Sequence, residues 1–172
     1  MKQAVLVGLM GSGKSTIGQI IAERTGRSFV DVDVAIAART GQAVRQLWEE
    51  GGEAAYQHLQ SEEVLQTLCA GAPVVLAAPD GVILDPAVRS ALQDAFVVWL
   101  RASPATLADR VRPGDHRPFL GDHPYEALSA MADSRSGLHG QVAHAVVDTD
   151  GVAPEAGADI VVNMVASSTA VA

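Results

Sequence analysis

The sequence predicts an α/β fold with a doubly wound, parallel β-sheet. Short apolar runs alternate with longer segments of helical periodicity, the order expected when a helix follows each strand. The apolar runs lack polar alternation, so we expect strands buried on both faces of a parallel sheet. A glycine-rich stretch from Gly8 to Ser15 separates the first run from the first helical segment. This stretch indicates a phosphate-binding turn, and the other candidate site residues are placed relative to it.

The elements follow in order along the chain. We expect strands at residues 3–7, 28–30, 73–78, 96–100 and 145–148. We expect helices at residues 14–25, 44–48, 53–70, 86–94, 124–138 and 154–166, with residues 34–70 mostly helical and residues 166–172 frayed. Gly26 and Gly41 end helices, and Gly51-Gly52 interrupts another. Ser103 and Pro104 suit the N-cap and first turn of the helix after the fourth strand.

Composition narrows the function classes. The chain has 172 residues, which favours one domain spanning 1–172, and its core must be aliphatic because aromatic residues make up only 4%. The net charge of −8 argues against a nucleic-acid partner, which needs a basic face. No apolar run is long enough for a membrane span or a signal peptide, so we expect a cytoplasmic protein. The single cysteine, Cys69, excludes an internal disulfide and lies on an apolar helical pattern, which predicts a small core residue rather than a reactive thiol.

The glycine-rich stretch fits the pattern G-x-x-x-x-G-K-[ST] at every defined position. Its glycines let backbone N–H groups turn toward phosphate oxygens, and the following helix adds its positive N-terminal dipole. The motif predicts that Lys14 reaches the outer phosphates of the ligand and that the Ser15 hydroxyl contacts Mg²⁺. The predicted nucleotide-binding residues of the motif are Gly11, Ser12, Gly13, Lys14, Ser15 and Thr16.

Two carboxylates, Asp31 and Asp33, follow the second strand and point to one side of it. In an open α/β sheet they lie near the phosphate loop, where ligands bind. One could contact the metal while the other orients or deprotonates an acceptor hydroxyl. The alternative is that one of them caps the helix that starts near Val34, since Asp is a favoured N-cap residue.

Residues 112–124 are rich in proline and glycine and form a loop longer than a plain connection needs. The loop carries Arg112, His116 and Arg117, so it is either a lid over the reacting phosphate or a solvated surface loop. Arg135, on the next expected helix, either faces the same cleft or lies in solvent. The remaining histidines show no metal-ligand spacing and are expected on the surface or in the core.

Taken together, these motifs resemble the shikimate kinase family over nearly the whole chain. The resemblance rests on the phosphate loop and on Asp31–Ile36, Arg39-Thr40-Gly41, Gly52-Glu53, Pro86–Arg89, Arg117–Leu120, Arg135 and Val147-Asp148-Thr149, in the family's order. It implies a P-loop fold like that of nucleoside monophosphate kinases, with a central five-stranded parallel sheet flanked by helices. It also implies ATP and Mg²⁺ as cofactors. An acceptor-binding helical region at about residues 33–60 and a lid at about residues 112–124 are implied as well.

The resemblance further implies roles for individual residues. Lys14, Asp33 and Arg117 would be catalytic, Asp33 as the base and Arg117 as the lid arginine. Ser15 and Asp31 would hold the metal, and Arg110 and Pro154 would pack the adenine. The substrate would be bound by Asp33, Gln57, Gly81 and Arg135, the last gripping its carboxylate.

Two positions depart from the family pattern on the acceptor side. Tyr56-Gln57 stands where the family has an aromatic residue followed by an arginine that pairs with the substrate carboxylate. Pro79-Asp80-Gly81 stands where the family has three glycines. Losing an arginine and gaining an aspartate lowers the local charge by two units, and proline has no N–H to donate. A smaller change is Gly137-Leu138-His139 in place of Pro-Leu-Tyr.

Three functions remain open from the sequence. The first is ATP-dependent phosphoryl transfer to a hydroxyl of shikimate or a shikimate-like ring compound. The second is a kinase of the same fold with another acceptor, such as a neutral or amino cyclitol or polyol, which Gln57 and Asp80 favour. The third is a catalytically weak nucleotide-binding protein. For each we expect a monomer with a small-molecule partner and no nucleic acid or membrane.

Overall fold

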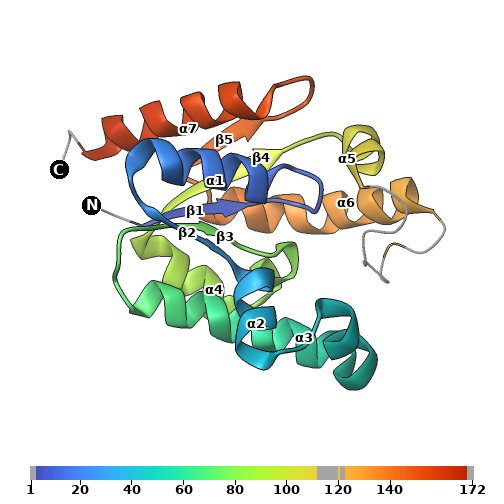
Figure 1. The fold of residues 1–172 in the computed structure, drawn as a ribbon. Helices are drawn as coiled ribbons and strands as arrows, with labels where there is room; N and C mark the ends of the chain where they lie inside the picture. The colour runs from blue at the N-terminus through green and yellow to red at the C-terminus, as the bar shows by residue number, and fades with distance from the viewer. Residues whose placement is uncertain (1–2, 112–119, 121–122, 170–172) are drawn as a thin grey trace.

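The strand β1 (Ala4–Val7) lies in the middle of a five-stranded sheet with the order β2-β3-β1-β4-β5. The other strands are β2 (Ser28–Asp31), β3 (Val74–Ala77), β4 (Phe96–Arg101) and β5 (Ala145–Asp148). All four pairings are parallel, as predicted (Figure 1). The computed structural model describes residues 3–111, 120 and 123–169.

Helices cover both faces of the sheet. One face packs against α1 (Lys14–Thr25) and α7 (Pro154–Thr169), which lie side by side (Figure 1). The other face packs against α3 (Val44–Cys69), α4 (Pro86–Ala91) and α6 (Pro124–Val142). The remaining elements are α2 (Val32–Thr40), α5 (Pro104–Arg110) and the 3₁₀ turns η1 (Asp80–Leu84) and η2 (Leu92–Asp94).

Side-chain alternation along β1 divides the core into two layers. Leu6 joins the apolar cluster under α1 and α7, whereas Val5 and Val7 join the cluster under α3, α4 and α6. All four residues of β1 are buried, as are all four of β3. Burial on both faces is therefore confirmed for β1 and β3, whereas the edge strands β2 and β5 are partly exposed.

Parallel register brings the carboxyl ends of the strands to one edge. Asp31, the last residue of β2, is paired in register with Ala77 of β3, and Leu6 of β1 is paired with the same residue. The chain segments that leave β1, β2 and β3 therefore begin side by side. In open α/β sheets the ligand site lies at this edge.

The interruption predicted at Gly51-Gly52 is confirmed, because the non-helical Gly52, with φ 74°, separates two helical segments within α3. Several other predicted boundaries are wrong. The predicted helix 86–94 divides into α4 and η2, while α6 extends to Val142 and α7 to Thr169. Cys69 is exposed rather than part of the core, because it is the last residue of α3 and lies beyond the part that packs on the sheet. No helix in the described part of the chain is long and apolar enough to cross a membrane.

Candidate active site

The loop between β1 and α1 has the backbone that the motif predicts. Gly8, Gly11 and Gly13 have φ of 141°, 80° and 94°, a region that glycine enters without strain. Gly8 also approaches β4 closely, because a Cβ there would lie 2.3 Å from the carbonyl oxygen of Leu100. Gly13 occupies the N-cap of α1 with no side-chain cap, so the first N–H groups of the helix remain directed at a ligand.

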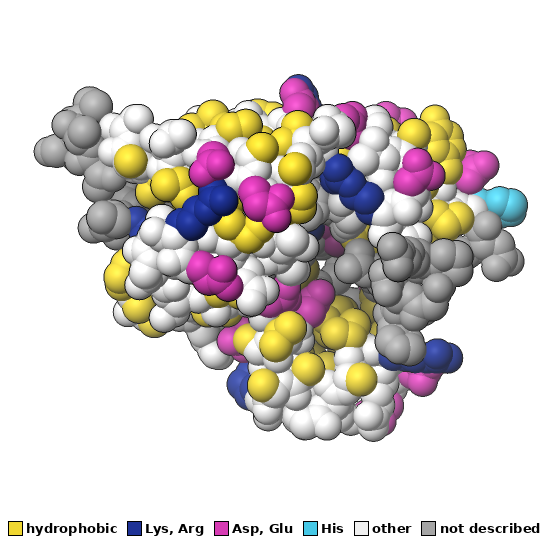
Figure 2. Space-filling view, turned by 45° about the horizontal axis from the view of Figure 1, so that its top comes forward, with side chains coloured by type: hydrophobic (Ala, Val, Ile, Leu, Met, Phe, Trp, Pro, Cys, Tyr) yellow, Lys and Arg dark blue, Asp and Glu magenta, His cyan; other side chains and the backbone are white. Residues whose placement is uncertain are grey.

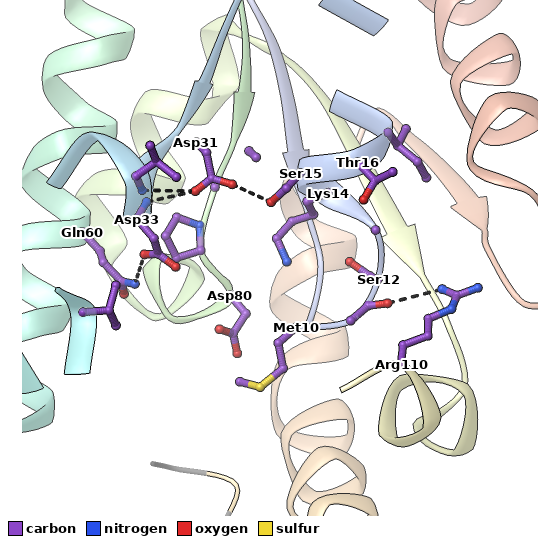
Figure 3. Close-up of a pocket in the computed structure, with 18 of the residues that line it drawn as sticks. Met10, Ser12, Lys14, Ser15, Thr16, Asp31, Asp33, Gln60, Asp80 and Arg110 are labelled. Carbon is purple, nitrogen blue, oxygen red and sulfur yellow. Dashed lines mark hydrogen bonds between the residues drawn. The ribbon is translucent and has the colours of Figure 1, made fainter. Parts of the chain in front are cut away.

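Lys14 lies against the inside of this loop. Its Nζ donates to the carbonyl oxygens of Gly8 at 2.7 Å and Leu9 at 3.0 Å. Figure 3 shows the side chain directed from α1 toward the part of the cleft that holds Asp33 and Asp80. The ammonium group is therefore held at the mouth of the phosphate cradle, where the outer phosphates of a nucleotide need neutralisation.

Ser15 and Asp31 meet at the edge between α1 and β2. The Ser15 hydroxyl donates to Oδ2 of Asp31 at 2.5 Å (Figure 3). The other oxygen of Asp31, Oδ1, accepts from the backbone N–H of Asp33 at 3.1 Å and of Val34 at 3.5 Å, so Asp31 is the N-cap of α2. The cap alternative and the metal hypothesis are thus compatible, since they use different oxygens. A hydroxyl and a carboxylate are hard oxygen donors of the kind that Mg²⁺ takes alongside phosphates and water.

Asp33, in the first turn of α2, is held by two residues of α3. Tyr56 Oη and Gln60 Nε2 each donate to its Oδ1 at 2.8 Å. Tyr56 and Gln60 are four residues apart, so one face of the helix presents both donors. Both bonds use the same oxygen, which orients the carboxylate within the cleft. Figure 3 shows the bond from Gln60. Burial, followed by the negative charge of Asp33, raises the pKa of Tyr56, so its hydroxyl remains a donor at neutral pH.

The predicted adenine end is assembled from α5 and the segment after β5. The guanidinium of Arg110 donates to the hydroxyl of Thr149 at 3.1 Å, to its carbonyl oxygen at 2.5 Å and to the carbonyl oxygen of Gly11 at 3.3 Å. Arg110, Thr149 and Pro154 line the same cleft as the phosphate loop. The structure therefore brings together Arg110 and Pro154, which are 44 residues apart by number.

At the acceptor end, Arg135 of α6 forms an ion pair with Asp80 at the start of η1. Both side chains are largely buried, with 12% and 16% of their surfaces exposed. Asp80 lines the cleft and points into it (Figure 3). The residue predicted to grip a substrate carboxylate is thus already matched with a carboxylate of the chain itself.

Gln57 and Gly81 lie against each other beside this pair. A Cβ on Gly81 would lie 3.5 Å from Nε2 of Gln57 and 3.7 Å from Oε1 of Gln60. Gln57 donates to Oε1 of Glu53 at 3.2 Å, along its own helix. Arg117, the predicted lid arginine, and most of the predicted lid lie outside the described residues.

One cleft with a volume of about 1050 Å³ is lined by the phosphate loop, Asp31, Asp33, Tyr56, Gln60, Asp80, Arg110 and Pro154. The predicted substrate residues Gln57, Gly81 and Arg135 lie outside this lining. Figure 2 shows a hollow between the body that carries the sheet and the part below it, with acidic side chains at its edge. The phosphate half of the cleft has Lys14 and the N-terminus of α1, whereas Asp31, Asp33 and Asp80 line the opposite wall. A volume of this size suits a nucleotide and a small second substrate.

A second cavity of about 230 Å³ lies behind the phosphate loop. Among the described residues, two buried side-chain atoms have no hydrogen-bond partner, Ser12 Oγ and His139 Nε2, and both residues line this cavity. His139 is stacked on Trp99 with ring centroids 5.4 Å apart. Burial, and then the positive charge of Lys14, lowers the pKa of His139 to about 4, partly offset by Asp80. His139 is therefore neutral at pH 7.

This shift predicts a loss of stability in weak acid. The unfolded chain takes up the His139 proton near pH 6.5, whereas the folded chain does so only near its pKa of about 4. The free energy of unfolding should therefore fall as pH drops through this window, by about 3 kcal/mol in all. Urea unfolding at pH 7.0, 5.5 and 4.5 tests this: between pH 7.0 and 4.5, the free energy of unfolding of His139→Phe should fall by about 2 kcal/mol less than that of the parent chain.

The exposed His58 provides the matched control. His58→Gln removes an imidazole from the surface of α3 and should leave the pH dependence of unfolding unchanged. If His139→Phe and the parent chain lose stability in parallel between pH 7.0 and 4.5, the assignment to His139 is wrong.

The sequence did not reveal the residues that hold the predicted site residues in place. The sequence did not predict that Tyr56 and Gln60 hold Asp33 or that Thr149 holds Arg110. The i, i+4 spacing of Tyr56 and Gln60 was a usable signal, because those positions share a helix face. The pairing of Asp80 with Arg135, which are 55 residues apart, had no sequence signal at all.

Comparison with known proteins identifies the family. The shikimate kinase family model matches residues 10–166. The chain is 42% identical over 150 residues to a shikimate kinase of Symbiobacterium thermophilum, covering 85% of this chain and 86% of that protein. It is 39% identical over 151 residues to one of Streptomyces coelicolor, covering 88% of each. The structure matches a shikimate kinase from Acinetobacter baumannii in complex with shikimate, with a TM-score of 0.93 and 28% identity over 98% of this chain and 94% of that one.

The match spans the phosphate loop from Met10 onward, the acceptor wall and the segment after β5, so it includes the whole cleft. The predicted P-loop kinase fold is confirmed by the same structural likeness. The chain therefore belongs to the shikimate kinase family.

Proposed function

We propose that this protein transfers the γ-phosphoryl group of ATP to a hydroxyl of shikimate or a shikimate-like ring compound. The relatives from S. thermophilum and S. coelicolor bear the name shikimate kinase, and the A. baumannii structure contains shikimate. One observation on this chain carries the proposal. The carboxylate of Asp33, fixed by Tyr56 and Gln60, lines the same cleft as the phosphate loop.

In this proposal each residue of the cleft has a distinct role. The N–H groups at the start of α1 and the Lys14 ammonium bind the phosphates of ATP and neutralise charge as it develops. Asp33 accepts the proton of the acceptor hydroxyl while the hydroxyl oxygen bonds to the γ-phosphorus. The bond from that phosphorus to the bridging oxygen breaks, and ADP leaves with the electron pair. In this proposal Arg117 reaches the transferred group, and Arg135, Gln57 and Gly81 contact the acceptor.

Ser15 and Asp31 would hold Mg²⁺, which supplies positive charge between the outer phosphates when bound. Their hydrogen bond places both oxygen donors at the mouth of the cradle. Arg110 and Pro154 would flank the adenine. The proposal also includes a single domain that acts as a cytoplasmic monomer and takes a small molecule as its partner. The net charge of −8 disfavours nucleic acid as a partner.

Measuring ADP release with ATP and Mg²⁺, with and without shikimate, tests this function. We expect saturable release that depends on the acceptor and stops when EDTA removes the metal, because transfer needs both an oriented hydroxyl and the charge of the ion. Calorimetry at millimolar ATP and Mg²⁺ provides the control for binding. Heat of association without turnover on a broad acceptor panel would instead favour a nucleotide-binding protein with little activity, and no heat at all would refute the phosphate assignment.

A further inference from the structure

The acceptor end of the cleft presents a carboxylate where an anionic substrate would need a cation. Asp80 lines the cleft, and its carboxylate is bonded to the guanidinium of Arg135 behind it. Both side chains are largely buried, at 16% and 12% exposed, so little water screens the pair. A ligand that enters this end therefore meets Asp80 before it meets Arg135.

The neighbouring side chains add no positive charge to compensate. Gln57 and Gly81, which lie against each other beside the pair, are both uncharged. Among the described residues, Asp31, Asp33 and Asp80 line the cleft with negative charge. The two arginines on this side are already paired, Arg45 with Glu49 and Arg135 with Asp80. A substrate carboxylate would have to displace Asp80 from Arg135 or lie beside an unpaired acid. Either alternative opposes its binding, because a desolvated charge without a partner is unfavourable.

Resting on the proposed phosphoryl transfer, we infer that Asp80 is a specificity-determining residue that occupies Arg135, so the pocket selects ring hydroxyls without selecting a carboxylate. The acceptor class that fits is a hydroxyl-bearing ring with an uncharged group on the Arg135 side. Hydroxyls can still bond to Asp33 and Asp80, whose oxygens are acceptors. The chain's own carboxylate thus takes the place that a substrate carboxylate would otherwise fill.

The direct test compares shikimate with its primary amide, which has nearly the same shape and no charge. We expect kcat/KM for the amide to equal or exceed that for shikimate in the unaltered enzyme, measured by ADP release. This comparison requires no substitution, so it stands even if variants of Asp80 fold poorly. A tenfold or greater preference for shikimate would overturn the inference.

Substitution then assigns the preference to Asp80. Asp80→Asn keeps the shape and an oxygen that can accept from Arg135, and it should raise the ratio of kcat/KM for shikimate over the amide about tenfold. The double change Gln57→Arg and Asp80→Gly should raise it further, mainly through a lower KM for shikimate. Asp85→Asn is the matched control: it removes the same charge nearby, at the N-cap of α4, where asparagine also caps well, and the ratio should not change.

The outcomes separate this inference from the function on which it depends. Turnover that strongly prefers shikimate, or a ratio that Asp80→Asn leaves unchanged, overturns the inference and supports the kinase assignment. Absence of ADP release with shikimate, its amide and neutral cyclitols, despite measurable ATP binding, overturns the proposed function and the inference with it. Turnover with the amide or a neutral cyclitol at least as efficient as with shikimate supports both.

Discussion

Replacing Lys14 with methionine should reduce kcat by about 10³-fold while the chain stays folded. The substitution removes the ammonium group at the mouth of the phosphate cradle. The negative charge that develops on the transferred phosphoryl group then lacks this fixed cation. Methionine has similar length and retains the apolar packing of the stem. The change also removes the donor that the carbonyl oxygens of Gly8 and Leu9 accept from. The measurement is ADP release at saturating ATP, with circular dichroism to check the fold.

Arg24→Met is the matched control for Lys14. It removes one positive charge from the opposite end of the same helix, where Arg24 pairs with Asp159 of α7. Because both partners of that pair are well exposed, the change should alter stability by less than about 1 kcal/mol. It should leave kcat within about twofold of the parent value, since Arg24 lies at the other end of α1 and outside the lining of the cleft. Normal turnover in Lys14→Met would refute the assignment of the phosphate cradle.

Asp33→Asn should reduce kcat by about 10²–10⁴-fold with little change in the Kd for ATP. The amide keeps an oxygen that can accept from Tyr56 and Gln60, so the side chain should retain its place. It cannot take up the proton of the attacking hydroxyl, so the effect should fall on the chemical step. Steady-state kinetics with calorimetry of ATP binding separates the two quantities.

Asp109→Asn serves as the control for Asp33. Asp109 is exposed on α5, which borders the nucleotide end of the cleft, and it has no role in the proposed transfer. The same loss of a carboxylate there should leave kcat unchanged. A variant of Asp33 that retains full turnover would exclude this residue as the base, and a parallel loss of ATP affinity would indicate that its role is structural.

Local patterns predicted the nucleotide half of the site well. The turn from Gly8 to Ser15 depends on backbone conformations that glycine permits and on the start of one helix, so all of its determinants lie within a few residues. The pairing of Asp31 with Ser15 follows nearly as directly, because strand register brings the ends of β1 and β2 to one edge. The sequence offered an N-cap role for Asp31 or Asp33 as an alternative, and the structure shows that Asp31 caps α2 with its second oxygen.

The acceptor half was less predictable for a physical reason. The roles of Asp80 and Arg135 depend on how α6 packs beside η1, and that packing is decided by the apolar clusters of the core rather than by any local motif. The same is true of Tyr56 and Gln60, which reach Asp33 only because α3 lies against α2. By contrast, the break at Gly52 within α3 was predicted, because a glycine interruption is a local signal.

The sequence by itself determined that this protein is a parallel α/β fold with a phosphate cradle after its first strand and a carboxylate pair after its second. These features follow from periodicity, from glycine conformations and from the shared direction of parallel strands, all of which act over short stretches of chain. Only the tertiary structure decided which charges meet at the acceptor end, where the carboxylate of Asp80 occupies Arg135. Charge pairing across 55 residues depends on the packing of distant elements, and no spacing rule encodes it.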